Sequence, residues 1–299
     1  MSLQRLPFER DGDDERGVVT LWLEQADRPV VVLDSDLLKA IDATLDEIGA
    51  DIGGLVLASR SRVFVAGANL GEIMELSDEE LHEYLAFGSR VFGRFATLPC
   101  TTVAAINGAA LGGGLEIAMH CDHLIASRPA SSSPEKPVKP YMIGLPEAGL
   151  SICPGWGGTC LLPARMAPER AIRATASGQP MTVYDASEAG LIEELVDGEG
   201  FMERARELAA TPKAEARTEP ISVAESSLRE AGAKALKAIR EDLPDTQAAR
   251  AVASCVEAGV SEGWEACLAA ERDSLVRLRG TDEGRAAIAA FFEKSGGRR

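Results

Sequence analysis

Residues 107–116 read Asn-Gly-Ala-Ala-Leu-Gly-Gly-Gly-Leu-Glu and connect an apolar strand pattern to an apolar helix pattern. Three consecutive glycines at such a junction remove every Cβ, so a ligand atom can approach the backbone N–H groups at the start of the helix. A developing negative charge is best stabilised at this position. The alternative is that the glycines only allow the helix and the strand to pack closely.

Glu116 favours the ligand-binding interpretation. It follows Gly113 by three residues, so on a helix its carboxylate shares a face with the Gly113 amide. The residues around it, 115 and 117–119, are apolar, and a carboxylate in such surroundings is costly unless it is hydrogen-bonded or functional. We therefore predict an anion-stabilising site with an acid beside it.

Two further segments have a similar character. Residues 64–70 read Phe-Val-Ala-Gly-Ala-Asn-Leu, and residues 143–150 read Ile-Gly-Leu-Pro-Glu-Ala-Gly-Leu. The second contains an isolated acid, Glu147, whose approach is fixed by the preceding proline, and a glycine-rich helix start at residues 154–159 follows it. On its own, Glu147 would more often be a solvated loop acid.

The first 200 residues alternate short β-rich runs with helical patterns, which predicts an α/β fold with crossover connections. The candidate strands are residues 18–23, 30–33, 55–59, 102–106, 123–126 and 191–196. Helices are predicted after an N-cap at residues 34–36, after a capping-box pattern at residues 77–80, and from Thr182 to a terminating glycine at Gly190.

The strand pattern ends after about residue 200. We predict an α/β core that carries the site at residues 1–200 and a helical C-terminal region at residues 201–299, with a linker at about 211–220. So small a helical region should pack on the core or on a neighbouring subunit. Residues 128–141 hold four prolines and three serines and are predicted to form a mobile loop.

Residues 64–70, 107–116 and 143–159 are together similar to the signature regions of the crotonase superfamily, the enoyl-CoA hydratases and isomerases. The similarity extends through roughly residues 15–200 and, more faintly, over the C-terminal helices. It is nearest to the hydratase part of multifunctional fatty-acid oxidation proteins, but the dinucleotide motif of their dehydrogenase part does not follow. The resemblance implies a crotonase-like spiral of ββα units with a C-terminal helical region.

The resemblance also implies roles for individual residues. The oxyanion hole falls on the backbone N–H groups of Ala68 and Gly113, and the two catalytic acids are Glu116 and Glu147. The residues expected to contact the substrate are Ala66 beside the adenine, Gly67, Gly112, Gly155 beside the water, and Arg62 and Lys294 beside the CoA phosphates. The chain departs from the family at Asn69, where an acid is common, at Gly71, and in the longer loop 128–141.

The expected activity is hydration of an enoyl-CoA to a 3-hydroxyacyl-CoA. The thioester itself supplies the electron sink, so neither a metal nor a redox cofactor is expected. One alternative is isomerisation of a 3-enoyl-CoA to a 2-enoyl-CoA, which uses one glutamate. Another is a non-catalytic acyl-CoA-binding or scaffold subunit. The family suggests a homotrimer or hexamer, and a separate 3-hydroxyacyl-CoA dehydrogenase is a candidate partner.

Composition argues against other classes of protein. The formal net charge of −16 opposes binding to nucleic acid. No signal peptide is recognisable, and no run reaches the roughly 18 apolar residues of a membrane helix, so we expect a cytoplasmic protein. The six cysteines lack CxxC spacing and are expected to be reduced and mostly buried. The run His120-Cys121-Asp122-His123 lacks a second ligand pair, so we predict a structural turn rather than a metal site.

Overall fold

A six-stranded sheet lies in the first of two units in this computed structural model. The structure describes residues 5–11, 17–26, 28–130 and 138–296. The first unit comprises Met1–Ala68, Arg90–Ile143 and Met181–Ile221, and the second comprises Asn69–Ser89, Gly144–Pro180 and Ser222–Arg299. Each unit is therefore assembled from separated stretches of the sequence.

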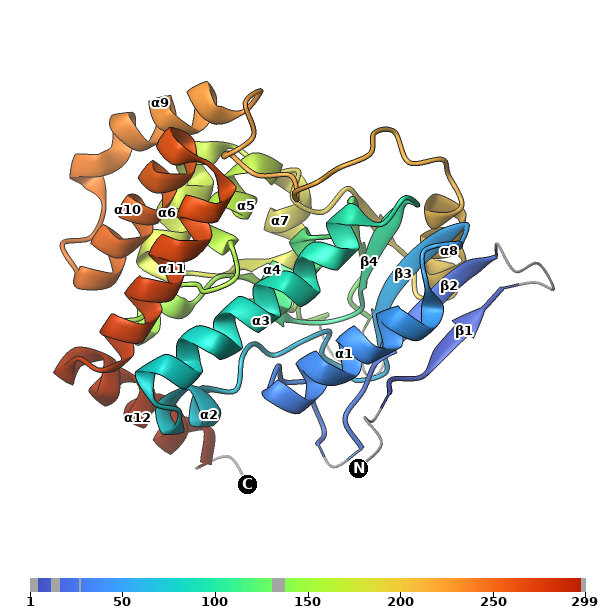
Figure 1. Ribbon diagram of the computed structural model, residues 1–299, viewed down its shortest axis with the longest axis horizontal. Helices are drawn as coiled ribbons and strands as arrows, with labels where there is room; N and C mark the ends of the chain where they lie inside the picture. Colours follow the sequence, from blue (N-terminus) through green and yellow to red (C-terminus); the bar gives the residue numbers. More distant parts are fainter. Residues whose placement is uncertain (1–4, 12–16, 27, 131–137, 297–299) are drawn as a thin grey trace. The chain divides into compact units, whose positions relative to one another are not determined.

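The sheet has the strand order β1-β2-β3-β4-β6-β9. Figure 1 labels its first four strands. Its strands are β1 (Phe8–Arg10), β2 (Val18–Leu23), β3 (Gly54–Ser59), β4 (Thr102–Ile106), β6 (His123–Ser127) and β9 (Glu194–Val196). Strand β1 is antiparallel to β2, and the other pairs are parallel. Every residue of β3 and β4 is buried, as expected of parallel strands that are covered on both faces.

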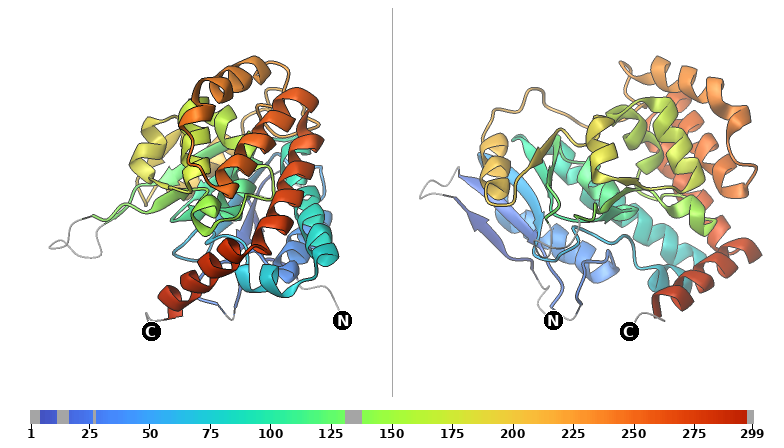
Figure 2. Two further views of the ribbon diagram at one scale, coloured as in Figure 1. Left: turned by 90° about the vertical axis from the view of Figure 1, so that its left-hand side faces the viewer. Right: turned by 180° about the vertical axis from the view of Figure 1, so that it is seen from behind.

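Helix α8 (Phe201–Ala209) covers one face of this sheet (Figure 2). Its Phe201 and Ala209 pack with sheet residues that include Val56 and Val103. The approach is closest at Gly54, where a Cβ would lie 2.1 Å from the Ala209 carbonyl oxygen. A larger residue at position 54 would therefore push α8 away from the sheet.

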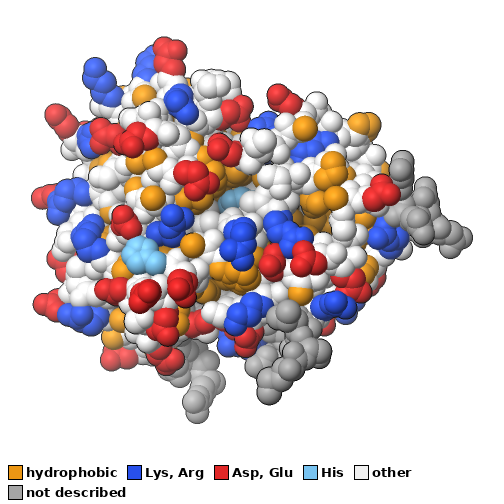
Figure 3. Space-filling model, viewed as in Figure 1, with side chains coloured by type: hydrophobic (Ala, Val, Ile, Leu, Met, Phe, Trp, Pro, Cys, Tyr) orange, Lys and Arg blue, Asp and Glu red, His pale blue; other side chains and the backbone are white. Residues whose placement is uncertain are grey.

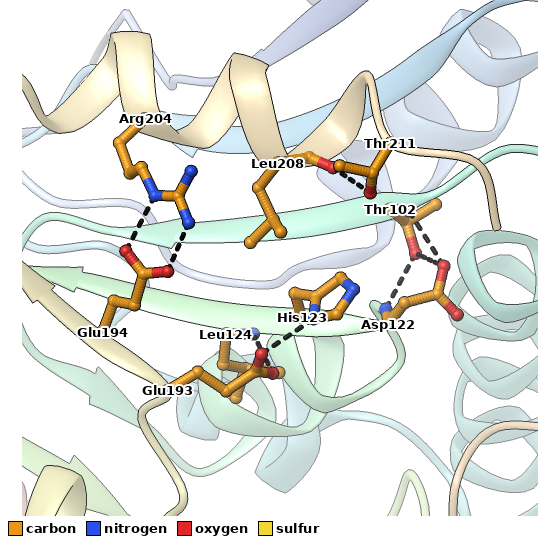
Figure 4. A network of polar contacts seen from close by, with 9 residues as sticks. All are labelled: Thr102, Asp122, His123, Leu124, Glu193, Glu194, Arg204, Leu208 and Thr211. Carbon is orange, nitrogen blue, oxygen red and sulfur yellow. Dashed lines mark hydrogen bonds and ion pairs between the residues drawn. The ribbon is translucent and has the colours of Figure 1, made fainter. Parts of the chain in front are cut away.

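Hydrogen bonds and ion pairs connect the edge strand of the sheet to α8 (Figure 4). Arg204 of α8 pairs with Glu194 of β9 at 2.5 Å. The neighbouring Glu193 accepts a hydrogen bond from Leu124 N–H at 3.2 Å and lies 2.8 Å from Nδ1 of His123. These contacts tie β9 to both β6 and α8.

Smaller elements complete the first unit. A second sheet contains β5 (Ala110–Leu111), β7 (Met142–Gly144) and β8 (Met181–Thr182). Helix α1 (Ser35–Ile48) begins after the N-cap Asp34, whose side chain accepts from Leu37 N–H. Helix α7 (Val183–Glu188) begins after Thr182 in a capping box. Both N-termini confirm the prediction from the sequence.

The second unit is mainly helical. Its elements are α2 (Leu70–Glu75), the first part of α3 (Asp78–Thr97), η1 (Glu147–Leu150), α5 (Gly158–Arg165), α6 (Pro168–Ser177), α9 (Arg229–Ile239), η2 (Arg240–Asp242), α10 (Gln247–Glu262), α11 (Trp264–Arg279) and α12 (Asp282–Gly296). Helix α10 packs against α6, α9 and α11 (Figures 1 and 2). Its buried face includes Val252 and Cys255, which join Ile152, Cys153 and Leu278 in one apolar cluster. The predicted C-terminal helices are therefore confirmed.

Two of the predicted strands are wrong in part. Residues 30–33 form only a single bridge, Leu33 to Ala68, because the Val32 N–H donates to the side chain of Gln25 instead of to a neighbouring strand. Of residues 191–196 only the last three are a strand. The N–H groups of residues 191 and 192 both donate to the Ala186 carbonyl at the end of α7. Residues 131–137 of the predicted loop 128–141 lie outside the described residues.

Surface features agree with the composition. Acidic and basic side chains are interspersed on the face drawn in Figure 3. Within the described ranges, no helix combines the length and apolar character that a bilayer crossing needs. All six cysteines are buried and carry free thiols, as expected.

Candidate active site

Two of the predicted site segments lie side by side in the first unit. Val65 and Ala110 form a parallel β-bridge. In it, Val65 N–H donates to the Ala109 carbonyl and Leu111 N–H donates to the Val65 carbonyl, both at 3.2 Å. Ala68 and Gly113 each follow a bridged residue by three positions. The bridge therefore brings the two segments that carry the predicted oxyanion-hole amides alongside each other.

Glycines make this close approach possible. A Cβ at Gly114 would lie 2.4 Å from the Val65 carbonyl oxygen, and one at Gly108 would lie 2.2 Å from the Arg62 carbonyl oxygen. Gly67 has a φ of +120°, in the region that side chains rarely allow. The packing role that the sequence left open is thus real, and it holds the two segments together.

Helix α4 (Gly113–Met119) begins directly after β5. Gly112 is its N-cap, with a φ of +53°. The N–H groups of Leu115 and Glu116 donate to the Gly112 carbonyl at 2.8 and 3.0 Å. The Gly113 N–H precedes these first helical bonds, so the helix itself offers it no acceptor.

The Ala68 N–H also takes no part in the hydrogen bonds described here that anchor its own segment. The bridge between Leu33 and Ala68 uses the Gly67 carbonyl, which accepts from Leu33 N–H at 2.9 Å. The Ala66 N–H donates to the Val31 carbonyl at 2.8 Å. The backbone on both sides of Ala68 is therefore anchored without using the Ala68 N–H in these bonds.

Glu116 lies in the buried helix α4 and is itself only 1% exposed. Its backbone carbonyl is 2.8 Å from Nδ1 of His120. Because a carbonyl can only accept, this bond places the His120 proton on Nδ1. His120 is the C-cap of α4, so this contact fixes the end of the short helix that presents Glu116.

The basic run at residues 60–62 divides into two different environments. Arg60 pairs with Glu9 and Glu24 at 3.1 and 3.2 Å and lies over the Trp22 ring. Arg62 is exposed, and no ion pair is found for it within the described part of the chain. Of the two arginines, Arg62 therefore has its charge available for an anionic ligand. The nearby Ala66, predicted to lie beside the adenine, is also exposed.

Glu147 lies in the second unit, at the start of η1 and directly after Pro146. The residue as a whole is partly exposed, but its Oε2 atom is buried and has no hydrogen-bond partner among the described residues. Burial is the main cause that raises the pKa of Glu147 to about 8, and the charge of Glu271 adds to it. A hydrogen bond from its own backbone N–H has the opposite effect and lowers the pKa. At neutral pH this carboxyl group is therefore mainly protonated and able to donate.

Gly155 belongs to a turn at residues 154–159 that leads into α5. The N–H groups of Gly157 and Thr159 donate to the two carboxylate oxygens of Glu271 at 2.5 and 2.8 Å. Trp156 is buried in the same turn, and its Nε1 donates to the Leu85 carbonyl at 3.1 Å. The backbone near Gly155 is thus held from two sides within the second unit.

Glu271 is the residue of this site that the sequence analysis missed. It is fully buried, although the region that contains it is rich in acids that are mostly solvated. A signal was present in the spacing of α11. Its buried residues include Trp264, Cys267, Leu268, Leu275 and Leu278, and position 271 falls on the same face. An acid on an apolar helical stripe is the same signal that drew attention to Glu116.

The remaining predicted residues have separate locations. Lys294 is an exposed residue of α12, a helix that packs against η1. Its neighbours Phe291 and Phe292 are also exposed. The first unit contains Ala68, Gly113 and Glu116, whereas the second contains Glu147, Gly155 and Lys294.

The side chains of residues 120–123 make separate structural contacts. Asp122 accepts from the N–H and the hydroxyl of Thr102 at 2.9 and 3.0 Å and pairs with Lys213 at 3.0 Å. His123 contacts Glu193, and Cys121 is buried. Within the described ranges, no group of three or more His, Cys, Asp or Glu side chains is arranged to hold a metal ion.

Known proteins share this fold. The family model for enoyl-CoA hydratase/isomerase matches residues 17–243. An enoyl-CoA hydratase/isomerase from Pseudoalteromonas atlantica T6c has a similar structure, with a TM-score of 0.64, 18% identity, and 97% of this chain and 98% of that chain covered. An enoyl-CoA hydratase/isomerase from Xanthobacter autotrophicus Py2 has a TM-score of 0.60 and 22% identity, with 98% and 99% covered. An enoyl-CoA hydratase from Bacillus anthracis has a TM-score of 0.59 and 24% identity, with 96% of each chain covered.

These matches confirm the predicted crotonase-like fold with its C-terminal helical region. The family match spans well over half of the residues. The chain therefore belongs to the enoyl-CoA hydratase/isomerase family of the crotonase superfamily.

Proposed function

We propose that this protein is an enoyl-CoA hydratase, which adds water across the 2,3 double bond of an enoyl-CoA thioester to give a 3-hydroxyacyl-CoA. The observation that carries the proposal is the state of Glu147. Its buried Oε2 has no partner among the described residues, and its pKa of about 8 keeps the group protonated at neutral pH. Such an acid suits the delivery of a proton to C2 that completes hydration.

In the proposed reaction, the thioester carbonyl oxygen accepts hydrogen bonds from the N–H groups of Ala68 and Gly113. These donors stabilise the enolate that forms when the water oxygen bonds to C3. The bridge between Val65 and Ala110 supports this role, because it aligns the two segments without using either amide. Removing one such donor typically costs about 10²–10³ in rate.

Glu116 and Glu147 divide the proton transfers between them. Glu116 takes a proton from the attacking water as the new C–O bond forms at C3, and Glu147 gives a proton to C2. The product thereby gains one hydroxyl group and one hydrogen, the elements of one water molecule. The proton on Glu116 then returns to Glu147 through solvent before the next turnover. Since the thioester is the electron sink, these steps require neither a metal nor a redox cofactor.

The CoA part of the substrate is assigned to basic and exposed groups. We place the adenine beside the backbone of Ala66 and the phosphates near Arg62 and Lys294. The exposure of Ala66 and of Arg62 supports this assignment, as does the pairing of the neighbouring Arg60 with two acids. A net charge of −16 makes such local cations necessary for an anionic substrate.

The test compares the wild type with Glu116→Gln, Glu147→Gln and the exposed control Glu230→Gln. Rates are measured with 2-enoyl-CoA and with 3-enoyl-CoA thioesters. We expect each acid variant to lower kcat for hydration by about 100-fold or more and the control to match the wild type. Much faster consumption of the 3-enoyl substrate would show an isomerase, which needs only one acid. Acyl-CoA binding with no turnover of either substrate by the wild type and Glu147→Gln alike would show a non-catalytic acyl-CoA-binding subunit.

A further inference from the structure

Glu271 places a fully buried carboxylate at the start of α5. Its Oε2 accepts from Gly157 N–H at 2.5 Å. Its Oε1 accepts from Thr159 N–H at 2.8 Å and from the Thr159 hydroxyl at 2.6 Å. Because both oxygens accept hydrogen bonds and face the amides of a helix N-terminus, the ionised form fits this site.

This carboxylate replaces a local helix cap. Gly157 is the N-cap of α5 and makes no side-chain capping bond, so the first N–H groups of the helix depend on another element. A serine or threonine N-cap could satisfy them without burying a charge, but Gly157 has a φ of +97° and leaves no room for a side chain beside Trp264. The acceptor therefore comes from α11 as a buried carboxylate, although burying a charge is costly.

The same face of α11 fixes the rest of the turn. A Cβ at Gly157 would lie 2.1 Å from the Trp264 ring, and one at Gly155 would lie 3.0 Å from Leu275 Cδ1. Residues 264, 271 and 275 are spaced by seven and four, which places them along one stripe. The backbone from Gly155 to Thr159 thus packs closely against α11. Glu271 makes the hydrogen bonds between α11 and this turn.

Glu271 also acts on the proposed acid through its charge. After burial, this charge is the second cause that raises the pKa of Glu147, and both residues lie in the second unit. The pKa values of two nearby thiols are raised as well, that of Cys153 mainly by its contact with Cys255 and that of Cys267 mainly by burial, and the charge of Glu271 adds to both. The pKa of Glu271 is itself raised, because burial outweighs the bonds from Thr159 and Gly157 and the charge of Arg272, which lower it. Two buried acids in this arrangement hold one proton more readily than none.

We propose that Glu271 is a positioning residue of the hydration reaction, which fixes the turn that carries Gly155 and holds a negative charge on the Glu147 side of the site. This inference rests on the proposed function. Gly155 is the residue expected to hold the attacking water, and Glu147 is the group expected to protonate C2. One carboxylate would thus set the place of the nucleophile and the charge state of the acid without touching the substrate.

The main test is Glu271→Gln, with Glu265→Gln on the exposed side of α11 as the matched control. The glutamine keeps the volume but turns an NH₂ group toward Gly157 N–H. We expect kcat to fall by about 10- to 100-fold with a nearly unchanged KM, and the alkaline limb of the kcat profile to move to lower pH. The sign follows because loss of a negative charge lowers the pKa of Glu147. A profile and a kcat equal to those of the control would overturn the proposal.

A second readout does not depend on activity. In protein labelled with ¹³C-glutamate, the Glu147 signal is assigned by its absence from Glu147→Gln and titrated in the wild type and in Glu271→Gln. A Glu147 pKa that is lower in Glu271→Gln supports the action of Glu271 on Glu147, whereas a wild type that hydrates no enoyl-CoA would refute the proposed function and leave this charge effect standing. An unchanged Glu147 pKa refutes the inference alone.

A milder variant covers the case in which Glu271→Gln does not fold. Thr159→Val removes the hydroxyl bond to Glu271 and the contact of the same hydroxyl with the Cys267 sulfur at 3.4 Å, and it keeps the backbone bond to Glu271. Glu271 should then take up a proton more readily. The Glu147 titration and the alkaline limb are then expected to shift in the same direction, by a smaller amount. A folded Thr159→Val protein with wild-type titration and kcat would count against the proposal.

Discussion

The backbone of Gly114 lies so close to Val65 that a Cβ on Gly114 would come within 2.4 Å of the Val65 carbonyl oxygen. That carbonyl also accepts the Leu111 N–H of the bridge between the two oxyanion segments. The spacing of Ala68 and Gly113 therefore depends on a glycine whose own backbone is proposed to do no chemistry.

The first prediction concerns this contact. Gly114→Ala must displace backbone rather than a flexible side chain, so we expect a loss of about 1–3 kcal/mol in the free energy of unfolding. A displacement of the oxyanion segments should also lower kcat/KM by roughly 10-fold or more. Denaturant unfolding and steady-state kinetics measure both effects. Gly93→Ala in α3 is the control, because a Cβ there meets nothing within 4 Å, and it should be neutral or slightly stabilising.

The second prediction concerns the pH dependence of the rate. With its pKa at about 8, Glu147 is protonated below that pH and loses its proton above it. As the proposed acid, it must be protonated to act, so kcat for hydration should fall as pH rises through about 8. The residual activity of Glu147→Gln should lack this limb. A wild-type kcat that stays constant between pH 7 and 9 would contradict the assignment of Glu147 as the acid.

The third prediction concerns stability. The folded protein holds the Glu147 proton with a pKa of about 8, well above the ordinary glutamate value of 4.5. Between these two values the folded state binds a proton that the unfolded state has lost, so stability falls as pH rises through this window. Glu147→Gln cannot lose that proton. Its melting temperature, relative to that of the wild type, should therefore be higher at pH 8 than at pH 5, and a constant difference would contradict the raised pKa.

The fourth prediction separates the two arginines of the 60–62 run. Arg62→Ala should raise KM for the acyl-CoA several-fold and leave kcat unchanged, because a charge that binds CoA acts equally in the ground and transition states. The effect should shrink at high salt. Arg60→Ala is the control, since Arg60 is already paired with Glu9 and Glu24. Equal effects of the two substitutions would mean that the phosphates bind elsewhere.

The sequence pattern was enough to predict elements that depend on neighbouring residues alone, such as apolar strands and helix caps. Strand 102–106 is apolar on consecutive positions and is buried throughout, and the capping box at Ser77 and Glu80 forms as predicted. The segment 30–33 has an equally apolar pattern, but its Val32 N–H is satisfied by a glutamine side chain. Only the three-dimensional arrangement could show that competing partner.

The candidate site could likewise be predicted from the sequence only in part. The glycines at 108 and 114 were visible in the sequence, and the structure explains them by contacts with Arg62 and Val65, which lie 46 and 49 residues away along the chain. Glu271 was not found, because its partners are Gly157 and Thr159, more than 100 residues earlier. Its place on the buried face of α11 was readable, but the need of α5 for a cap was not.

The packing of Gly259 against Cys160 has a practical consequence. A Cβ on that glycine would lie 2.3 Å from the Cys160 sulfur, and the neighbouring Cys153 and Cys255 sulfurs are 3.9 Å apart. An alkylating reagent needs more room than these helices leave, so each thiol must wait until its surroundings open before it can react. The rate of thiol labelling therefore measures how often the helices around these cysteines open. It can be measured on the unmodified protein without any substrate.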